Sequence, residues 1–120
     1  MDLKKTALKF NDCINSRDIG GLSSLMTDDH AFIDTADNVF HGKEQCINIW
    51  KQFFAAFPDY RNIFTKATER GDAVIIEGRS VCSEKALEGP AIWMAKIREE
   101  KVAQWRIYPD TPDTRKTLGL

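Results

Sequence analysis

Apolar side chains recur every three or four positions in three segments of the chain, the spacing that places them on one face of a helix. The segments are residues 2 to about 16, about 18 to 26, and 43 to about 57. Pro58 follows the third segment directly, and proline does not continue a helix. The pattern therefore predicts three helices in the first half of the chain.

From Tyr60 onward the pattern changes to alternation of apolar and polar residues, which is typical of strands that bury one face. Short turn-like links separate the alternating segments, and successive strands joined in this way form an antiparallel meander. The predicted strands are 60–70, 73–83, 90–98 and 102–108. From about residue 110 the chain is polar and interrupted by prolines, so a peripheral surface segment is expected there.

A shorter strand pair is predicted between the second and third helices, where segments 30–35 and 39–42 flank a polar turn. Side chains alternate across a strand, so His30, Phe32 and Asp34 share one face. That face carries two ionisable groups around an aromatic ring, and a small α+β protein would normally bury it. The sequence therefore predicts a pocket beside this strand.

Helices, a hairpin and then a meander make an α+β chain, and its 120 residues suit one domain. The economical arrangement is a single curved antiparallel sheet, a cone-like half barrel, wrapped around the three N-terminal helices. Such a sheet leaves a cavity between itself and the helices. Its other face also needs cover, and a second copy of the chain is the simplest source, so a homodimer is predicted.

Composition narrows the functional classes. The net charge is −1, and acidic and basic residues are interspersed, which does not favour a nucleic-acid or membrane surface. The apolar runs are too short to span a bilayer, and the N-terminal stretch does not resemble a signal peptide. Cys13, Cys46 and Cys82 lie far apart and form no C-x-x-C pair. Reduced thiols in a cytoplasmic protein are expected, without a metal site.

Three motifs resemble the NTF2-like superfamily. They are T-D-D-H-A-F-I-D-T at 27–35, F-H-G-K-E-Q at 40–45 and K-V-A-Q-W-R-I-Y-P-D at 101–110. The likeness runs from about Leu3 to Asp110, and within the superfamily it is greatest for the SnoaL-like polyketide cyclase and ketosteroid isomerase branch. The resemblance implies a cone-shaped α+β barrel, usually a homodimer, with a deep pocket at its wide end.

Ketosteroid isomerase uses an aspartate base and an oxyanion hole made of a tyrosine and a protonated aspartic acid. By position, the resemblance places Asp34 at the base and Phe10 at the tyrosine. Trp93, or Ile92 in a register shifted by one, falls at the protonated aspartic acid. Phenylalanine cannot donate a hydrogen bond, so steroid isomerisation is disfavoured. SnoaL-like cyclases use a pocket aspartate with a nearby histidine, a pair that Asp34 and His30 would supply from one strand.

Asp34 and His30 are therefore the candidate catalytic residues, each with a plainer alternative. Asp34 is either a carboxylate at the pocket mouth, with its pKa raised by apolar neighbours, or a strand-end aspartate that accepts hydrogen bonds in the turn with Thr35 and Asn38. His30 is either its partner acid or a strand-starting histidine bonded to the backbone. His41 is expected at the surface or pocket rim.

Large rings are the candidate ligand contacts. Trp50, Trp93 and Trp105 are expected to face inward, together with Phe10 and Phe32. One interpretation is that they form the hydrophobic core. The other is that they present flat walls and indole N–H groups to a ring-bearing ligand, and both can hold at once.

The strand 73–83 has two possible registers. In the register implied by the resemblance, Glu77 and Arg79 face inward, and Arg79 could bind a carboxylate ligand. A shift of one residue places both charges in solvent. Tyr60 is assigned to packing and turn chemistry, and Tyr108 to the edge of the pocket.

Three functional hypotheses follow. The first is a cofactor-free, metal-free isomerase- or cyclase-like enzyme that transfers a proton on a small apolar, polyketide-like or steroid-like substrate, with Asp34 as base and His30 as helper. The second is a ligand-binding or interaction module that uses the same pocket without chemistry. The third is a purely structural dimer. Fold alone does not choose among them.

Overall fold

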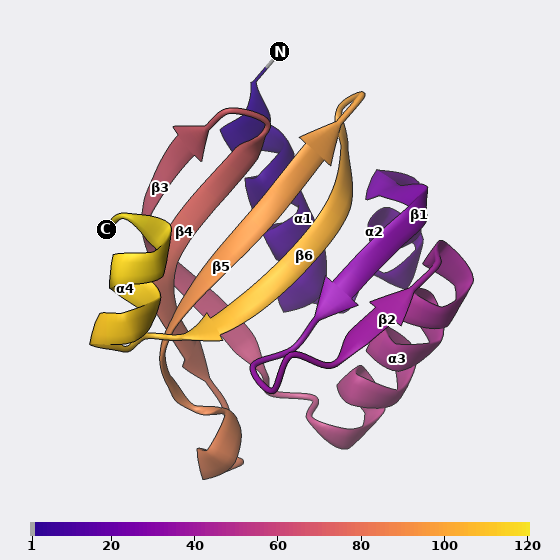
Figure 1. Cartoon of the computed structure of the whole chain (residues 1–120). Helices are drawn as coiled ribbons and strands as arrows, with labels where there is room; N and C mark the ends of the chain where they lie inside the picture. Colours follow the sequence, from indigo (N-terminus) through magenta and orange to yellow (C-terminus); the bar gives the residue numbers. More distant parts are fainter. Residues whose placement is uncertain (1) are drawn as a thin grey trace.

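The computed structural model describes residues 2–120. In this part of the chain three α-helices and six strands follow one another in the order expected from the sequence, and a fourth α-helix lies at the C-terminus (Figure 1). The elements are α1 (Leu3–Ser16), α2 (Ile19–Leu25), β1 (Met26–Ile33), β2 (Val39–His41), α3 (Lys43–Ala56), β3 (Arg61–Arg70), β4 (Ala73–Val81), the 3₁₀ turn η1 (Lys85–Leu87), β5 (Gly89–Arg98), β6 (Lys101–Pro109) and α4 (Pro112–Leu118).

The six strands form one sheet in the order β2-β1-β6-β5-β4-β3. The predicted hairpin and the predicted meander are both present as antiparallel pairs. The two halves join where β1 and β6 pair in parallel. The sheet is therefore mixed rather than wholly antiparallel, and its single parallel pair brings together strands that are far apart in the sequence.

Local signals set the helix ends. The Asp2 side chain accepts a hydrogen bond from the Lys5 backbone N–H at 3.1 Å, which caps α1. Arg17 ends this helix in the left-handed conformation, with φ of 59°. At α3 the helix stops just before Phe57 and Pro58, as predicted. No helix among residues 2–120 is long and apolar enough to cross a bilayer.

The strand expected at 30–35 begins and ends earlier than predicted. β1 starts at Met26 and ends at Ile33, and its pairing with β6 is irregular between Met26 and Ala31. Asp34 lies beyond the strand, in the turn that leads to β2, because its backbone N–H bonds to the carbonyl of Asn38 at 3.1 Å. This shift changes the setting of Asp34 from a strand face to a turn.

The core lies between the sheet and the first three helices, where Figure 1 shows α1 behind β4, β5 and β6 and α3 beside β1 and β2. Phe10 of α1 packs against Trp105 of β6, with ring centroids 4.7 Å apart. Trp50 of α3 packs edge-on against Phe32 of β1 at 5.6 Å. Trp93, Ala95 and Ile107 also join this core, which confirms the predicted inward face of the last two strands.

The strand β4 takes the register opposite to the one implied by the resemblance. Val74 and Ile76 join the core and Ser80 is buried, so this alternate set faces inward. Glu77 and Arg79 lie on the outer face, where Arg79 is exposed. The expectation that both charges face the pocket is wrong, because the strand is shifted by one residue.

Gly78 lies where β3 runs unusually close alongside its neighbour β4. A Cβ at this position would lie 2.2 Å from the carbonyl oxygen of Ile63 and 2.9 Å from the Cα of Phe64. The pairing of β3 with β4 is irregular between Phe64 and Lys66, directly beside this contact. A glycine is therefore required where the two strands approach most closely.

The C-terminal segment is a helix, α4, rather than an irregular tail. The Thr111 hydroxyl caps it by accepting from the Thr114 N–H at 3.2 Å. Arg115 bonds Asp110 through two nitrogens, at 2.7 and 2.9 Å, and reaches Glu77 on the sheet at 2.9 Å. Figure 1 shows α4 on the face of the sheet opposite α1. Part of the outer face, expected to need a second copy of the chain, is thus covered by the chain itself.

Candidate functional site

A cavity of about 320 Å³ opens where several elements end at one edge of the sheet. The turn after β1, the end of α3, the η1 loop and the adjoining ends of β5 and β6 surround it. Its walls are mainly apolar, with Phe53, Leu87, Ala91 and Ile107 among the lining side chains. This size and lining are typical of sites for small organic molecules.

Asp34 lies at this cavity, but its carboxylate belongs to a turn. Oδ1 accepts hydrogen bonds from the backbone N–H groups of Ala36 and Asn38, each at 2.9 Å. Oδ2 accepts from Nδ2 of Asn38 at 3.0 Å. The predicted placement at the pocket mouth and the turn alternative are therefore both present in the structure.

The hydrogen bonds decide the charge state of Asp34. Burial disfavours the carboxylate, but the bonds from Asn38 and Ala36 together outweigh burial and hold the pKa below the ordinary range of an aspartate. The expectation that apolar neighbours raise this pKa is wrong, because the turn supplies three donors to the ionised form. Asp34 is therefore a carboxylate at neutral pH and a weak base.

His30 is fully buried and lies away from the cavity. Its Nδ1 donates to the carbonyl of Val102 at 2.7 Å, and its ring packs against Phe10 with centroids 5.7 Å apart. Burial lowers its pKa, against the opposing effects of the Val102 hydrogen bond and the Asp29 charge. Four residues of extended chain, roughly 13 Å, separate it from Asp34. The two do not form a proton-transfer pair.

The predicted ring contacts occupy the core. Phe10, Trp93 and Trp105 have no exposed surface, and Trp50 is 4% exposed. Phe32 is half-buried between the rings of β2 and α3. These side chains belong to the core or pack against it and are not among those that line the cavity. Arg79, the remaining predicted contact, is on the outer face, as described above.

Two buried hydroxyl residues at the cavity were not predicted as site residues. Tyr60 and Ser80 both line it, and their hydroxyl oxygens are 3.1 Å apart. Behind them Ser80 donates to Oδ1 of Asn62 at 2.9 Å, and Nδ2 of Asn62 donates to Oδ1 of Asn11 at 3.2 Å. All four residues are buried. A polar chain therefore runs from the cavity wall to α1 through an otherwise apolar interior.

The donor and acceptor of each hydrogen bond in this polar chain can be derived from its inner end, at Asn62 and Asn11. Because Nδ2 of Asn62 faces Asn11, its Oδ1 faces Ser80 and accepts the one hydroxyl proton that Ser80 has. Ser80 then has no proton left for Tyr60, so the Tyr60 hydroxyl donates to Ser80. Burial raises the pKa of Tyr60, which keeps the phenol protonated. Tyr60 consequently offers the cavity lone pairs rather than a proton.

The alternation of residues along the predicted strand from Tyr60 contained a sign of this polar chain of hydrogen bonds. Tyr60 and Asn62 share one face, and a polar residue on the apolar face of a strand usually has a buried partner. Finding the partner Ser80 required the correct register of β4. The sequence left that register open, so these hydrogen bonds could not be predicted from it.

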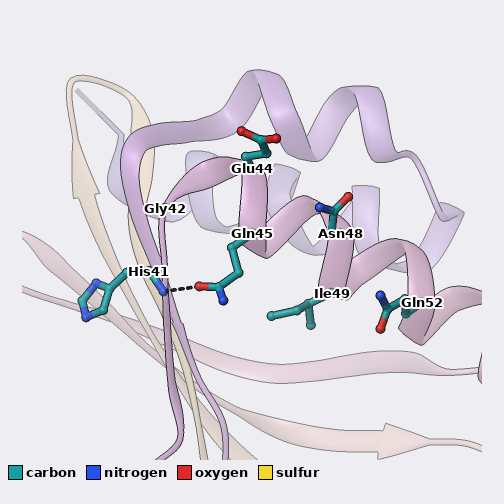
Figure 2. Close-up of a pocket in the computed structure, with 7 residues that line it drawn as sticks. All are labelled: His41, Gly42, Glu44, Gln45, Asn48, Ile49 and Gln52. Atoms are coloured by element: carbon teal, nitrogen blue, oxygen red, sulfur yellow. Dashed lines mark hydrogen bonds between the residues drawn. The ribbon is translucent and has the colours of Figure 1, made fainter.

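A second hollow lies along the outer side of α3 (Figure 2). The His41 backbone N–H donates to Oε1 of Gln45 at 3.1 Å, while the His41 ring points away from that contact. Glu44, Asn48 and Gln52 are exposed, so this surface is open to solvent. His41 is a surface residue, as predicted, and none of the residues that line this hollow is buried, in contrast to Tyr60, Ser80 and Ala91 of the first cavity.

Solved structures with the same fold are numerous. A candidate SnoaL-like polyketide cyclase from Shewanella putrefaciens has a TM-score of 0.78 and 18% identity, over 99% of this chain and 98% of that one. A hypothetical protein with a ketosteroid isomerase-like fold from Catenulispora acidiphila, in complex with trimethylamine, has a TM-score of 0.77 and 19% identity, over 96% of this chain and 92% of that one. An LEH-like epoxide hydrolase from M. tuberculosis has a TM-score of 0.78 and 14% identity, over 97% and 88%.

At these identities the structural matches establish the fold, and they confirm the predicted NTF2-like architecture. Comparison with curated protein sequences gives no match. The family model of the SnoaL-like domain matches residues 7–105, which covers most of the chain. The chain belongs to the SnoaL-like domain family of the NTF2-like superfamily.

Proposed function

We propose that this protein binds a small, mainly apolar organic molecule in the cavity between Asp34 and Tyr60. The observation that carries the proposal is the cavity itself, about 320 Å³, with apolar walls and a few polar groups at defined places. Tyr60, Ser80 and Ala91 line the cavity and are themselves buried, so this part of its wall is fixed before a ligand binds. Fixed walls reduce the ordering cost of binding.

Known relatives support a small-molecule role without identifying the ligand. The Catenulispora relative is in complex with trimethylamine, and others are described as a polyketide cyclase and an epoxide hydrolase. The ligands and reactions of these proteins differ. The shared feature carried over to this chain is a small-molecule site, and the chemistry performed there is a property of each chain's own residues.

A second candidate function is proton transfer with Asp34 as general base, as in an isomerase or cyclase. The position of Asp34 at the cavity favours this candidate, and the carboxylate is ionised at neutral pH, as a base must be. His30 does not assist, since it is buried elsewhere. The turn hydrogen bonds weaken the base, which makes binding without chemistry the leading proposal.

We propose a cytoplasmic location and a homodimer as the wider setting. The three free thiols favour the location, since Cys46 and Cys82 are buried and unpaired. A homodimer would form around α4 rather than across a bare sheet, because Arg115 holds this helix against the outer face. Sedimentation equilibrium measures the dimer directly, and a monomer up to high micromolar concentration would contradict it.

The binding proposal is tested by NMR titration with 2-phenylethanol, a neutral molecule that fits the cavity. Amide shifts are expected to concentrate around residues 34–35, 86–91 and 107–109. Ala91→Leu fills the cavity and is expected to abolish these shifts. Ala55→Leu on the exposed side of α3 is the matched control and is expected to keep them. Shifts confined to other surfaces, or equal effects of the two variants, would contradict the proposal.

A further inference from the structure

The charged side chains that line the cavity are acidic. Among the described residues, Asp34 and Glu88 are its only charged lining groups, and no lysine, arginine or histidine lines it. Arg106, next to Ile107 on β6, faces the outer side, where it pairs with Asp37 and lies 4.5 Å from the centroid of the Tyr108 ring. The cavity therefore has a negative potential that no neighbouring lining residue cancels.

The buried hydroxyl of Tyr60 also favours a ligand that donates a hydrogen bond. The proton of the Tyr60 hydroxyl is committed to Ser80, and the proton of Ser80 is committed to Asn62. What Tyr60 offers a ligand is an oxygen lone pair. A ligand carboxylate or carbonyl at this point would face a lone pair without a donor, and buried polar groups that stay unpaired lower affinity.

Two aromatic rings complete this environment. Phe53 and Tyr60 line the cavity and meet edge to face, with centroids 4.8 Å apart and an interplanar angle of 88°. Ring faces carry partial negative charge and attract ammonium groups. Carboxylate, hydroxyl lone pair and ring faces all favour the same ligand chemistry.

We propose that the ligand of this cavity carries a protonated amine on an apolar body. The ammonium group donates to Tyr60 and lies near the carboxylate of Asp34, which keeps free lone pairs beyond its turn hydrogen bonds. The apolar body packs against Phe53 and Ile107. This inference rests on the proposed binding function and adds the class of ligand to it.

Three probes of similar size and different charge test the inference: 2-phenylethylamine, 2-phenylethanol and 3-phenylpropanoate. Dissociation constants are measured by NMR titration at pH 7 and low salt. The amine is expected to bind about fivefold tighter than the alcohol, and the carboxylate more weakly than both. Added salt should weaken amine binding and leave the alcohol unchanged, because screening acts on charge.

Substitutions of the two acidic lining residues test whether they cause the preference for the amine. Asp34→Asn keeps an acceptor for the turn and removes the charge, so the preference for amine over alcohol is expected to fall about threefold. Glu88→Gln is a second charge variant in case the first perturbs the turn. Asp28→Asn, an exposed aspartate that does not line the cavity, is the matched control.

The outcomes separate the two proposals. Alcohol and amine binding with equal affinity would overturn the ligand class and leave the binding site standing. Tighter binding of the carboxylate would overturn the ligand class as well. If neither amine nor alcohol shifts the cavity amides, both proposals fail. An amine preference that Asp34→Asn and Glu88→Gln leave intact would show that these carboxylates do not select the ligand.

Discussion

The Nδ1–H group of His30 in β1 donates to the carbonyl of Val102 in β6, at 2.7 Å, next to the irregular part of the parallel pairing between these two strands. The carbonyl accepts only, so Nδ1 carries the proton and Nε2 is bare. Within residues 2–120, Nε2 has no hydrogen-bond partner. The ring is fully buried, and protonating it would place an unpaired charge in an aromatic core. His30 thus links the two halves of the sheet only in its neutral form.

This geometry predicts acid sensitivity. Burial lowers the pKa of His30 in the folded state, so the unfolded chain binds the extra proton more readily. The stabilisation is fully present above about pH 6.5, the ordinary histidine pKa, and is lost as the pH falls toward the lowered folded value. The free energy of unfolding should decrease by up to about 1.4 kcal/mol per pH unit in that window.

Urea titrations between pH 8 and pH 5 measure this slope. His30→Gln keeps a donor and removes the titration, so its slope between pH 6.5 and 5 should be clearly flatter. His41→Gln, at the exposed end of β2, is the control. Equal slopes in the two variants would contradict the role of His30.

The pKa of Asp34 is predicted to lie below that of a free aspartate. Three hydrogen bonds stabilise its ionised form, so its contribution to stability is present above about pH 3.9 and lost as the pH falls through the lowered folded pKa. Carbon-detected NMR titration of the carboxyl group measures it. Asn38→Ala removes the side-chain donor and should move the pKa of Asp34 upward. A raised pKa in the native protein would restore the proton-transfer candidate.

Gly78→Ala is expected to destabilise the fold by at least about 1–3 kcal/mol. The added Cβ would lie 2.2 Å from the Ile63 carbonyl oxygen, a backbone atom that cannot move without shifting β3. Gly20→Ala in α2 is the matched control, because its Cβ would make only an ordinary contact of 3.7 Å with Asp18. That change should be neutral or stabilising. Thermal and urea unfolding compare the two, and similar stabilities would contradict the close approach.

The Tyr60–Ser80 bond is expected to show coupling in a double-mutant cycle. Ser80→Ala leaves the Tyr60 hydroxyl and the Asn62 oxygen unpaired in a buried site and should cost about 1–3 kcal/mol. Tyr60→Phe removes one partner, so the double variant should cost less than the sum of the single ones. Additive costs would show that the two hydroxyls do not interact.

Arg115→Ala should loosen α4 while the rest of the fold stays intact, since within residues 2–120 only Arg70 then still binds the helix to the sheet through hydrogen bonds. The guanidinium links Asp110, Glu77 and the helix, so its loss should speed amide hydrogen exchange in residues 112–118 with little change in β4 or β5. Lys116→Ala, exposed on the same helix, is the control. Unchanged exchange in α4 would show that other contacts hold the helix.

Local patterns in the sequence determined the helices, the order of the strands and the inward face of the last two strands. Each of these depends on residues a few positions apart, such as the apolar spacing along α1 or the stop at Pro58. The family resemblance added the expectation of a pocket at the wide end of the fold. Trp93 and Trp105 were correctly placed inward because alternation in β5 and β6 is regular.

The register of β4 depended on tertiary structure. Val74, Ile75 and Ile76 are all buried, so three consecutive apolar residues conceal which face is the core. The close approach of β3 at Gly78 and the hydrogen bond from Tyr60 to Ser80 select one of the two registers. Neither is visible in a strand taken alone.

The C-terminal helix and the separation of the two candidate catalytic residues were likewise decided in three dimensions. α4 is short and polar, and two contacts between residues far apart in sequence hold it: the ion pair of Arg115 with Glu77, and the hydrogen bonds from Arg70 to the carbonyls at the end of the helix. Asp34 left the strand because donors in the following turn bind its carboxylate, and His30 went into the core because Val102 offers an acceptor there. Sequence periodicity specifies which residues share a face, whereas long-range hydrogen bonds and close packing decide what that face meets.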